Sequence, residues 1–91
     1  MATQHKRQRR SAGWHLKHSY LDTYGMSNEA LAAQLDISPQ VVEQIISGEL
    51  AITAEMAIKL GAALETSPEL WLNLQNAHAL DQVKKAEILT A

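Results

Sequence analysis

The chain has 91 residues, no cysteine and a formal net charge of −2. This length corresponds to one domain, and the lack of cysteine excludes disulfides and Cys-ligated zinc. No apolar stretch approaches the roughly 20 residues that a transmembrane helix needs, and the basic N-terminus is not followed by the apolar segment of a secretory signal. We therefore expect a cytoplasmic protein with no membrane contact.

The charged residues are unevenly distributed along the chain. Residues 1–17 contain five Lys or Arg and no acid, whereas residues 18–58 contain no Lys or Arg and six acidic residues. We predict that residues 1–12 form a flexible basic arm. A basic arm on an acidic body indicates an anionic partner, and a solvated tail without a partner is the alternative.

The first two predicted helices lie before and after Gly25. Trp14–Tyr24 is helical in its spacing, and Gly25 provides the C-terminal stop. Ser27 is a good N-cap for the second helix. The apolar positions of the first helix are Leu16, Tyr20, Leu21 and Tyr24; the second helix is expected to bury Leu31 and Leu35 through a small-residue surface of Ala30, Ala32 and Ala33.

Three further helices are predicted from their capping residues. Ser38-Pro39 begins a helix over 39–47, which Gly48 ends; its β-branched residues also suit a strand, but the caps favour a helix. Thr53 caps a fourth helix through Leu64, and Ser67-Pro68 begins a fifth. The packing candidates are Met56, Ile58, Leu60 and Leu64 in the fourth, and Leu70, Trp71, Leu72 and Leu74 in the fifth.

The predicted fold class is all-α. Five short helices joined by loops of a few residues make a compact orthogonal bundle over residues 13–77. Residues 78–91 form a helical tail that frays. Its apolar residues Leu80, Val83, Ile88 and Leu89 either fold back on the bundle or meet a partner.

Residues 28–48 have the spacing of a helix-turn-helix motif. Small Ala32 permits close approach of the two helices, Asp36 stands where a left-handed residue is needed, and Ile37 fills the corner between them. Val42 and Ile45 then anchor the second helix. The outer face of that helix carries Gln40, Glu43, Gln44 and, at its edge, Val41. In such motifs the N-terminal half of the second helix enters the DNA major groove.

Residues 13–75 resemble the HigA/VapI antitoxin branch of the XRE (lambda-repressor-like) helix-turn-helix proteins. The resemblance is carried by Gly13-x-x-Leu16, Tyr20-Leu21, Gly25-Met26-Ser27, Leu31-Ala32-x-x-Leu35-x-Ile37-Ser38, Gly48, Ile52-Thr53, Met56-Ala57-x-x-Leu60 and Ser67-Pro68-x-x-Trp71-Leu72-Asn73-Leu74-Gln75. The last string is the most diagnostic. The resemblance implies a homodimer that represses its own operon by binding double-stranded operator DNA and neutralises a RelE-like (HigB) toxin that cleaves messenger RNA.

The chain departs from that family where cations are usual. Family members place Arg or Lys in the recognition helix and the loop after it, whereas this chain has Pro39, Gln44, Glu49 and Leu50 there. It also has Glu43, where the family commonly has a small polar residue. Non-specific DNA affinity comes almost entirely from neutralised phosphates. The recognition surface therefore lacks much of that contribution.

Other residues are candidates to replace those cations. Gln40 and Gln44 can pair with adenine, and Glu43 can accept from cytosine N4. Backbone N–H groups at helix N-termini assist phosphate binding by neighbouring hydroxyl and amide side chains. The phosphate candidates are Ser27, Asn28 and Ser38 in the motif, and Lys6, Arg7, Arg9 and Arg10 in the arm.

The fifth helix offers residues for the core or for a dimer interface. Trp71 and Leu74 suit packing on the first and fourth helices, whereas the Leu70–Leu80 face also suits an interface between two copies, where aromatic residues are enriched. We assign Trp71, Leu74 and Leu80 to one or other of these roles.

Two other functions fit parts of the sequence. A protein-interaction module that neutralises a toxin without reading DNA suits the acidic body, because such toxins are basic. A metal-dependent enzyme would use His15, His18 and Asp22, which fall along one helix. His15, however, stands where the family has an apolar packing residue, and the sequence holds no other catalytic motif. We therefore predict no enzyme, no metal and no cofactor.

Overall fold

The computed structural model describes the backbone of residues 9–90 and the side chains of residues 9–85, and these residues fold into helices. The first helical stretch joins α1 (Ala12–His15), a π-helical segment η2 (Leu16–Leu21) and α2 (Asp22–Tyr24). It is followed by α3 (Asn28–Leu35), α4 (Pro39–Ser47), α5 (Ala54–Leu64) and α6 (Pro68–Thr90). The predicted all-α helix-turn-helix fold is confirmed.

The first helix begins two residues earlier than predicted, and its middle segment is π-helical. Ser11 caps it by accepting a hydrogen bond from the Trp14 amide at 3.0 Å. Leu16 and Leu21 are both buried. They are five positions apart, and a π-helix places such residues on nearly one face because its hydrogen bonds span five residues. Tyr24, predicted to lie on this apolar face, is instead 57% exposed, beyond the π-helical segment.

Most helix ends are capped as the sequence predicted. The hydroxyls of Ser27, Thr53 and Ser67 accept hydrogen bonds from amides three residues further on. Gly25 and Gly48 both have positive φ at helix C-termini, where a residue without Cβ pays no steric penalty. These local interactions set the helix boundaries on either side of the turns.

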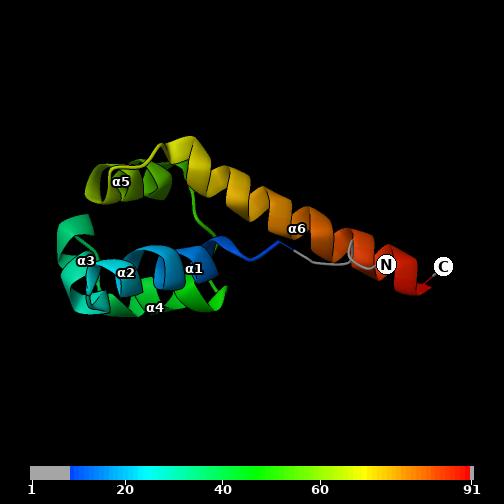
Figure 1. Cartoon of the computed structure of the whole chain (residues 1–91), viewed down its shortest axis with the longest axis horizontal. Helices are drawn as coiled ribbons and strands as arrows, with labels where there is room; N and C mark the ends of the chain where they lie inside the picture. The colour runs from blue at the N-terminus through cyan, green and yellow to red at the C-terminus, as the bar shows by residue number, and fades with distance from the viewer. Residues whose placement is uncertain (1–8, 91) are drawn as a thin grey trace.

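The core lies between two groups of helices. Figure 1 shows α5 and the start of α6 on one side, and α1 to α4 on the other. Its buried apolar residues are Ala12, Leu16, Leu21, Leu31, Ala32, Leu35, Val42, Ile45, Ile52, Ala57, Leu60, Leu64 and Trp71. Three expected contributors are exposed: Ala30, Ala33 and Ile58. They lie on the outer faces of α3 and α5, because only one stripe of each helix meets the core.

The last helix is longer than predicted. The fifth helix and the C-terminal tail form one uninterrupted helix, α6, because no Gly or Pro follows Pro68 to stop it. Its second half leaves the body (Figure 1), and the described part of the molecule measures 45 × 23 × 22 Å. Leu80 and Val83 are exposed there, so these two residues of the predicted stripe do not fold back on the bundle, whereas the side chains of Ile88 and Leu89 lie outside the described part of the chain. Within the described residues, no helix is both long and apolar enough to span a membrane.

Candidate nucleic-acid interface

The motif predicted at residues 28–48 consists of α3, a three-residue turn and α4. Asp36 adopts the predicted left-handed conformation, with φ of 59°. The Ala32 carbonyl accepts a hydrogen bond from the Ile37 amide at 3.0 Å, which closes the end of α3. Ser38 then has an extended backbone, and Pro39 occupies the first turn of α4. The turn chemistry therefore places the two helices as the sequence predicted.

One face of α4 is buried and the opposite face is exposed. Val42 and Ile45 pack in the core, as predicted. Gln40, Glu43 and Gln44 are all exposed. Residues at spacings of three and four share one helix face, so the structure brings the three predicted base-reading side chains together on the solvent side of α4.

The three predicted phosphate-binding residues of the motif lie at helix N-termini. Ser27 caps α3, with its Oγ 3.0 Å from the Ala30 amide, and Asn28 follows it, half-buried. Ser38 caps α4 by position only, because its hydroxyl receives no capping hydrogen bond in the described part of the chain. The Ser38 hydroxyl is exposed beside the first amides of α4, where the helix dipole favours an anion.

Lys17, a described cation near the motif in sequence, is paired with a carboxylate of the same chain at the surface. Its Nζ donates to Asp22 Oδ1 at 2.7 Å, and His18 Nδ1 lies 3.5 Å from the other carboxylate oxygen. The hydrogen bond from Lys17, with the nearby charges of Lys17 and His18, lowers the pKa of Asp22. This surface ion pair leaves the motif without a free cation of its own.

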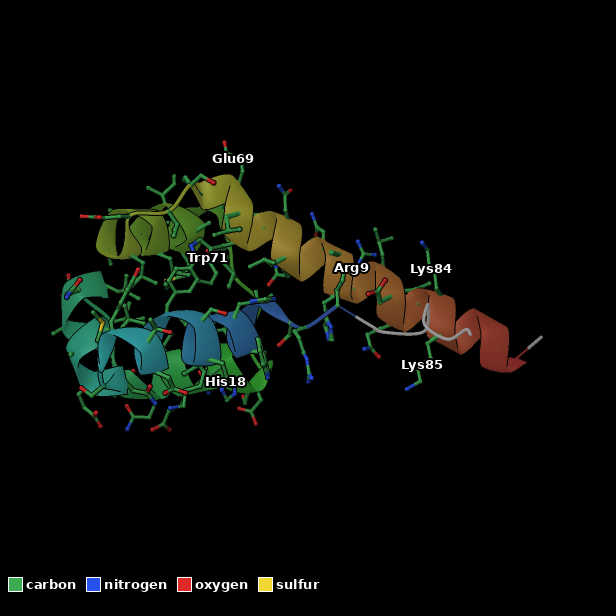
Figure 2. All side chains as sticks on the ribbon, in the orientation of Figure 1. Arg9, His18, Glu69, Trp71, Lys84 and Lys85 are labelled. Atoms are coloured by element: carbon green, nitrogen blue, oxygen red, sulfur yellow. The ribbon has the colours of Figure 1, made fainter. Side chains whose placement is uncertain are left out.

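The two arm cations that the structure describes, Arg9 and Arg10, also contact other side chains. The Arg9 guanidinium forms an ion pair with Asp81 of α6, with Nη2 and Oδ1 2.7 Å apart. Arg10 lies over the Trp14 ring, 5.0 Å from its centroid, in the range of a cation–π contact. Figure 2 shows Arg9 beside α6, with Lys84 and Lys85 further along that helix. Lys6 and Arg7 lie outside the described residues.

The residues assigned to the core or a dimer interface differ in exposure. Trp71 is fully buried between the two groups of helices (Figure 2). Its indole N–H donates to Thr66 Oγ1 at 2.7 Å, and its ring lies 5.2 Å from that of Tyr20. Leu74 is partly buried, whereas Leu80 is 55% exposed. Trp71 is therefore a core residue, and the accessible apolar surface of α6 begins beyond Leu74.

The histidines of the first helix point to different neighbours. His15 Nδ1 lies 3.3 Å from Ser19 Oγ, whereas His18 is near Asp22 and its ring lies 4.7 Å from that of Trp14. Partial burial, with the nearby charge of Arg10, lowers the pKa of His15. Within the described residues, no group of three His, Asp or Glu side chains converges on a point where a metal ion could bind.

Two structurally important positions are not indicated by the sequence. Gln75 pairs its amide with the backbone of Ile52: it accepts from the Ile52 amide at 2.6 Å and donates to the Ile52 carbonyl at 3.0 Å. This pair holds the loop after α4 against α6. In the sequence, Gln75 stands out only as the last residue of the string that begins at Ser67. Glu65 has φ of 59° at the end of α5, and no local signal marked it.

The chain is similar in sequence to known helix-turn-helix proteins. A helix-turn-helix family model (HTH_3) matches residues 19–71. Antitoxin HigA-1 of Vibrio cholerae is 42% identical over 76 residues, which cover 84% of this chain and 70% of the relative. The uncharacterized HTH-type transcriptional regulator YddM of Escherichia coli strain K12 is 40% identical over 65 residues, which cover 71% of this chain and 69% of the relative.

A solved structure has the same fold and similar length. It is the Pseudomonas aeruginosa antitoxin HigA with the higBA promoter, and it superimposes with a TM-score of 0.81 at 31% sequence identity. The superposition covers 91% of this chain and 90% of the other. The likeness therefore includes α6 as well as the helix-turn-helix motif.

Proposed function

The chain belongs to the helix-turn-helix family, in its HigA/VapI-type branch, and from that premise we propose that it is an operator-binding antitoxin. It binds its own promoter as a homodimer, represses its operon and neutralises an mRNA-cleaving, RelE-like (HigB) toxin. It acts in the cytoplasm without catalytic activity of its own. The relative solved with the higBA promoter supports the DNA partner.

The exposed face of α4 is the observation that carries this proposal. Gln40, Glu43 and Gln44 share that face, while Val42 and Ile45 fix the helix from behind. A glutamine amide can pair with adenine N6 and N7, and a carboxylate can accept from cytosine N4. A rigid helix that presents these three groups can read base edges in the major groove.

Phosphate contacts must come from around this face rather than from it. Residues 18–58 contain no Lys or Arg. We propose that Ser27, Asn28 and Ser38 bind phosphate oxygens at the N-termini of α3 and α4, together with the first amides of each helix. Lys6, Arg7 and Arg10 are the proposed cationic contribution of the wild-type arm, and Arg9 adds to it only when it is released from Asp81.

A symmetric pair of chains would present two recognition helices to one face of DNA. In dimeric helix-turn-helix proteins the half-sites lie about 34 Å apart, one turn of the double helix. We place the dimer interface on the exposed apolar stripe of α6, where Leu80 and Val83 are 55% and 56% exposed. Ala79, which precedes Leu80 in the chain, lines a cavity of about 220 Å³ together with Leu50 and nine other residues.

The experiment is a gel shift with the DNA upstream of the chain's own gene, at low and moderate salt, against unrelated competitor DNA. We expect a specific shift at low salt. Gln40→Ala should lose about 1–3 kcal/mol at one or two base pairs and bind other sequences as before. Gln82→Ala removes an exposed glutamine of α6 and serves as the matched control. The absence of a specific shift by the wild type would rule out the DNA-binding proposal.

A toxin-neutralising module without DNA binding is the second candidate. The charge distribution favours it, because the exposed surface of the motif carries Glu29, Asp36, Glu43 and Glu49 with no cation between residues 18 and 58. Such a surface complements a basic RNA-cleaving partner. Co-purification of a small basic protein encoded beside this gene, without any gel shift, would favour this candidate over the first.

A further inference from the structure

The N-terminal arm is attached to the last helix by a group of residues far apart in sequence. Arg9 donates three hydrogen bonds to Asp81: from its backbone amide at 2.8 Å, from Nε at 3.0 Å and from Nη2 at 2.7 Å. His78 Nδ1 lies 2.9 Å from the Arg9 carbonyl oxygen. Because a carbonyl only accepts, the histidine nitrogen is the donor. We call Arg9, His78 and Asp81 the arm latch.

The latch occupies Arg9 in the way that a phosphate would. Guanidinium groups bind carboxylates and phosphates with the same planar pair of N–H donors. Here Nε and Nη2 meet the two oxygens of one carboxylate. The Asp81 side chain is 15% exposed and that of Arg9 is 57% exposed. The anion is thus the more buried partner, on a helix, and the cation is the more exposed one.

The latch also directs the arm away from the base-reading residues. Residues 9–11 run from the start of α1 toward α6, whereas α3 and the beginning of α4 lie at the other end of the body (Figure 1). Ser11 and His78 line the same cavity as Ile45 and Gly48, which lie at the C-terminal end of α4. The first turn of α4, with Gln40, is the turn farthest along the helix from this point.

We propose that Asp81 is an internal competitor of the DNA backbone, which holds Arg9 on α6 and so keeps non-specific DNA affinity low. The proposal rests on the DNA binding proposed above. Each phosphate neutralised by a cation adds to affinity in a salt-dependent way. The recognition surface has no Lys or Arg. Withdrawing one arginine of the arm therefore removes a large share of the positive charge available to DNA phosphates. Opening the latch makes this arginine available to a phosphate.

The test measures the affinity of the full chain for an unrelated DNA duplex and for its own promoter over a range of salt concentrations. Asp81→Asn keeps the shape of the side chain and removes its charge. We expect it to bind both duplexes about five- to tenfold more tightly near 0.1 M salt, with a salt slope steeper by about 0.9, the value for one added phosphate contact. Glu69→Gln, an equal charge change at an exposed position of α6, should have no such effect.

Arg9→Ala separates competition from simple positioning. In the wild-type background it should change affinity less than twofold, because the latch already withholds Arg9. Combined with Asp81→Asn, it should abolish the gain. Unchanged DNA binding by Asp81→Asn would overturn the proposal, because the ion pair would then not limit DNA affinity. Weaker binding by Asp81→Asn, or a loss of affinity in Arg9→Ala alone, would also overturn it, because the latched arm itself would then contact DNA.

Two readouts without operator DNA keep this inference separate from the proposed function. Trypsin should cleave after Arg9 several-fold faster in Asp81→Asn than in the wild type, as followed by mass spectrometry. Asp81→Asn should also elute from phosphocellulose at higher salt than Glu69→Gln, which carries the same change of net charge. If the wild type binds no DNA at low salt, the proposed function fails, and these readouts decide the latch. Equal cleavage rates and equal elution would overturn it.

Discussion

Among the residues that the structure describes, two other than glycine have left-handed backbone conformations, and both end helices. Asp36 follows α3 and Glu65 follows α5, each with φ of 59°. Asp36 was predicted, because aspartate tolerates this region and the motif requires a turn there. Glutamate has no such preference. Its conformation follows from the Thr66 amide, which donates to the Gly61 carbonyl at 3.0 Å, and from the close start of α6.

Replacing Glu65 should therefore stabilise the protein. A left-handed conformation costs a residue with Cβ about 1–2 kcal/mol, and glycine avoids this cost. Glycine also has greater freedom in the unfolded chain, which offsets part of the stabilisation. We expect Glu65→Gly to raise the free energy of unfolding by about 0.5–1 kcal/mol in urea denaturation. Asp36→Gly should gain less. Glu65→Ala keeps the strain, and a gain from it as large as that from Gly would contradict this explanation.

The charge state of Asp81 makes one contribution to stability pH-dependent. Three hydrogen bonds from Arg9 hold the pKa of Asp81 well below its ordinary value. A carboxyl group whose pKa is lower in the folded state stabilises the protein above its unfolded pKa, about 3.9, and loses this effect as the pH falls below it. The difference in urea midpoint between wild type and Asp81→Asn should thus be constant from pH 5.5 to 8.

Below about pH 4 the two midpoints should converge. A difference between wild type and Asp81→Asn that stayed constant to pH 2.5 would mean that the ion pair is not its source.

The elements are joined by a few polar contacts as well as by the apolar core. In the loop between α4 and α5, Gln75 of α6 pairs with both backbone polar groups of Ile52. A buried or partly buried backbone group without a partner is costly. This one side-chain amide therefore ties the loop after α4 to α6.

Substitutions at Gln75 should show a graded loss of stability. Gln75→Leu leaves the Ile52 amide and carbonyl unpaired and should lower the free energy of unfolding by about 2–3 kcal/mol. Gln75→Glu keeps an acceptor for the amide but loses the donor, so its loss should be smaller. Gln82→Leu, at an exposed position of the same helix, should change stability by less than about 0.5 kcal/mol. Equal effects of the two leucine variants would argue against the pairing.

The shape of the whole molecule follows from α6. Its first half carries Trp71 into the core, and its second half extends beyond the body with Leu80 and Val83 exposed (Figure 1). Exposed apolar residues in a row on a helix are typical of an interaction surface. A second copy related by a twofold axis would cover the stripe with the same stripe.

Charged residues on this stripe should separate the copies. We expect the wild type to sediment as a dimer and the double variant Leu80→Asp, Val83→Asp as a monomer, because carboxylates cannot be buried unpaired in an apolar contact. Its specific operator affinity should fall, since two half-sites are no longer bound together. Gln82→Asp is the control for added charge. A wild type that is monomeric at all concentrations would contradict this assignment.

Much of the fold and the exposure of the candidate base-reading residues could be predicted because their signals are local. Ser27, Thr53 and Ser67 bond to amides three residues away, Gly25 and Gly48 end helices by their own backbone conformation, and the exposure of Gln40, Glu43 and Gln44 follows from helical spacing against Val42 and Ile45. Each of these features depends on a window of a few residues, which the sequence displays directly.

The remaining features were decided only by the tertiary structure. Arg9 and Asp81 are 72 positions apart and Ile52 and Gln75 are 23 apart, so neither partner marks the other in sequence. The π-helical turn that buries Leu16 with Leu21, the exposure of Ile58, and the continuation of α6 past the bundle likewise depend on which surfaces meet. Capping is a property of neighbours in the chain, whereas pairing across the fold exists only once the helices have packed.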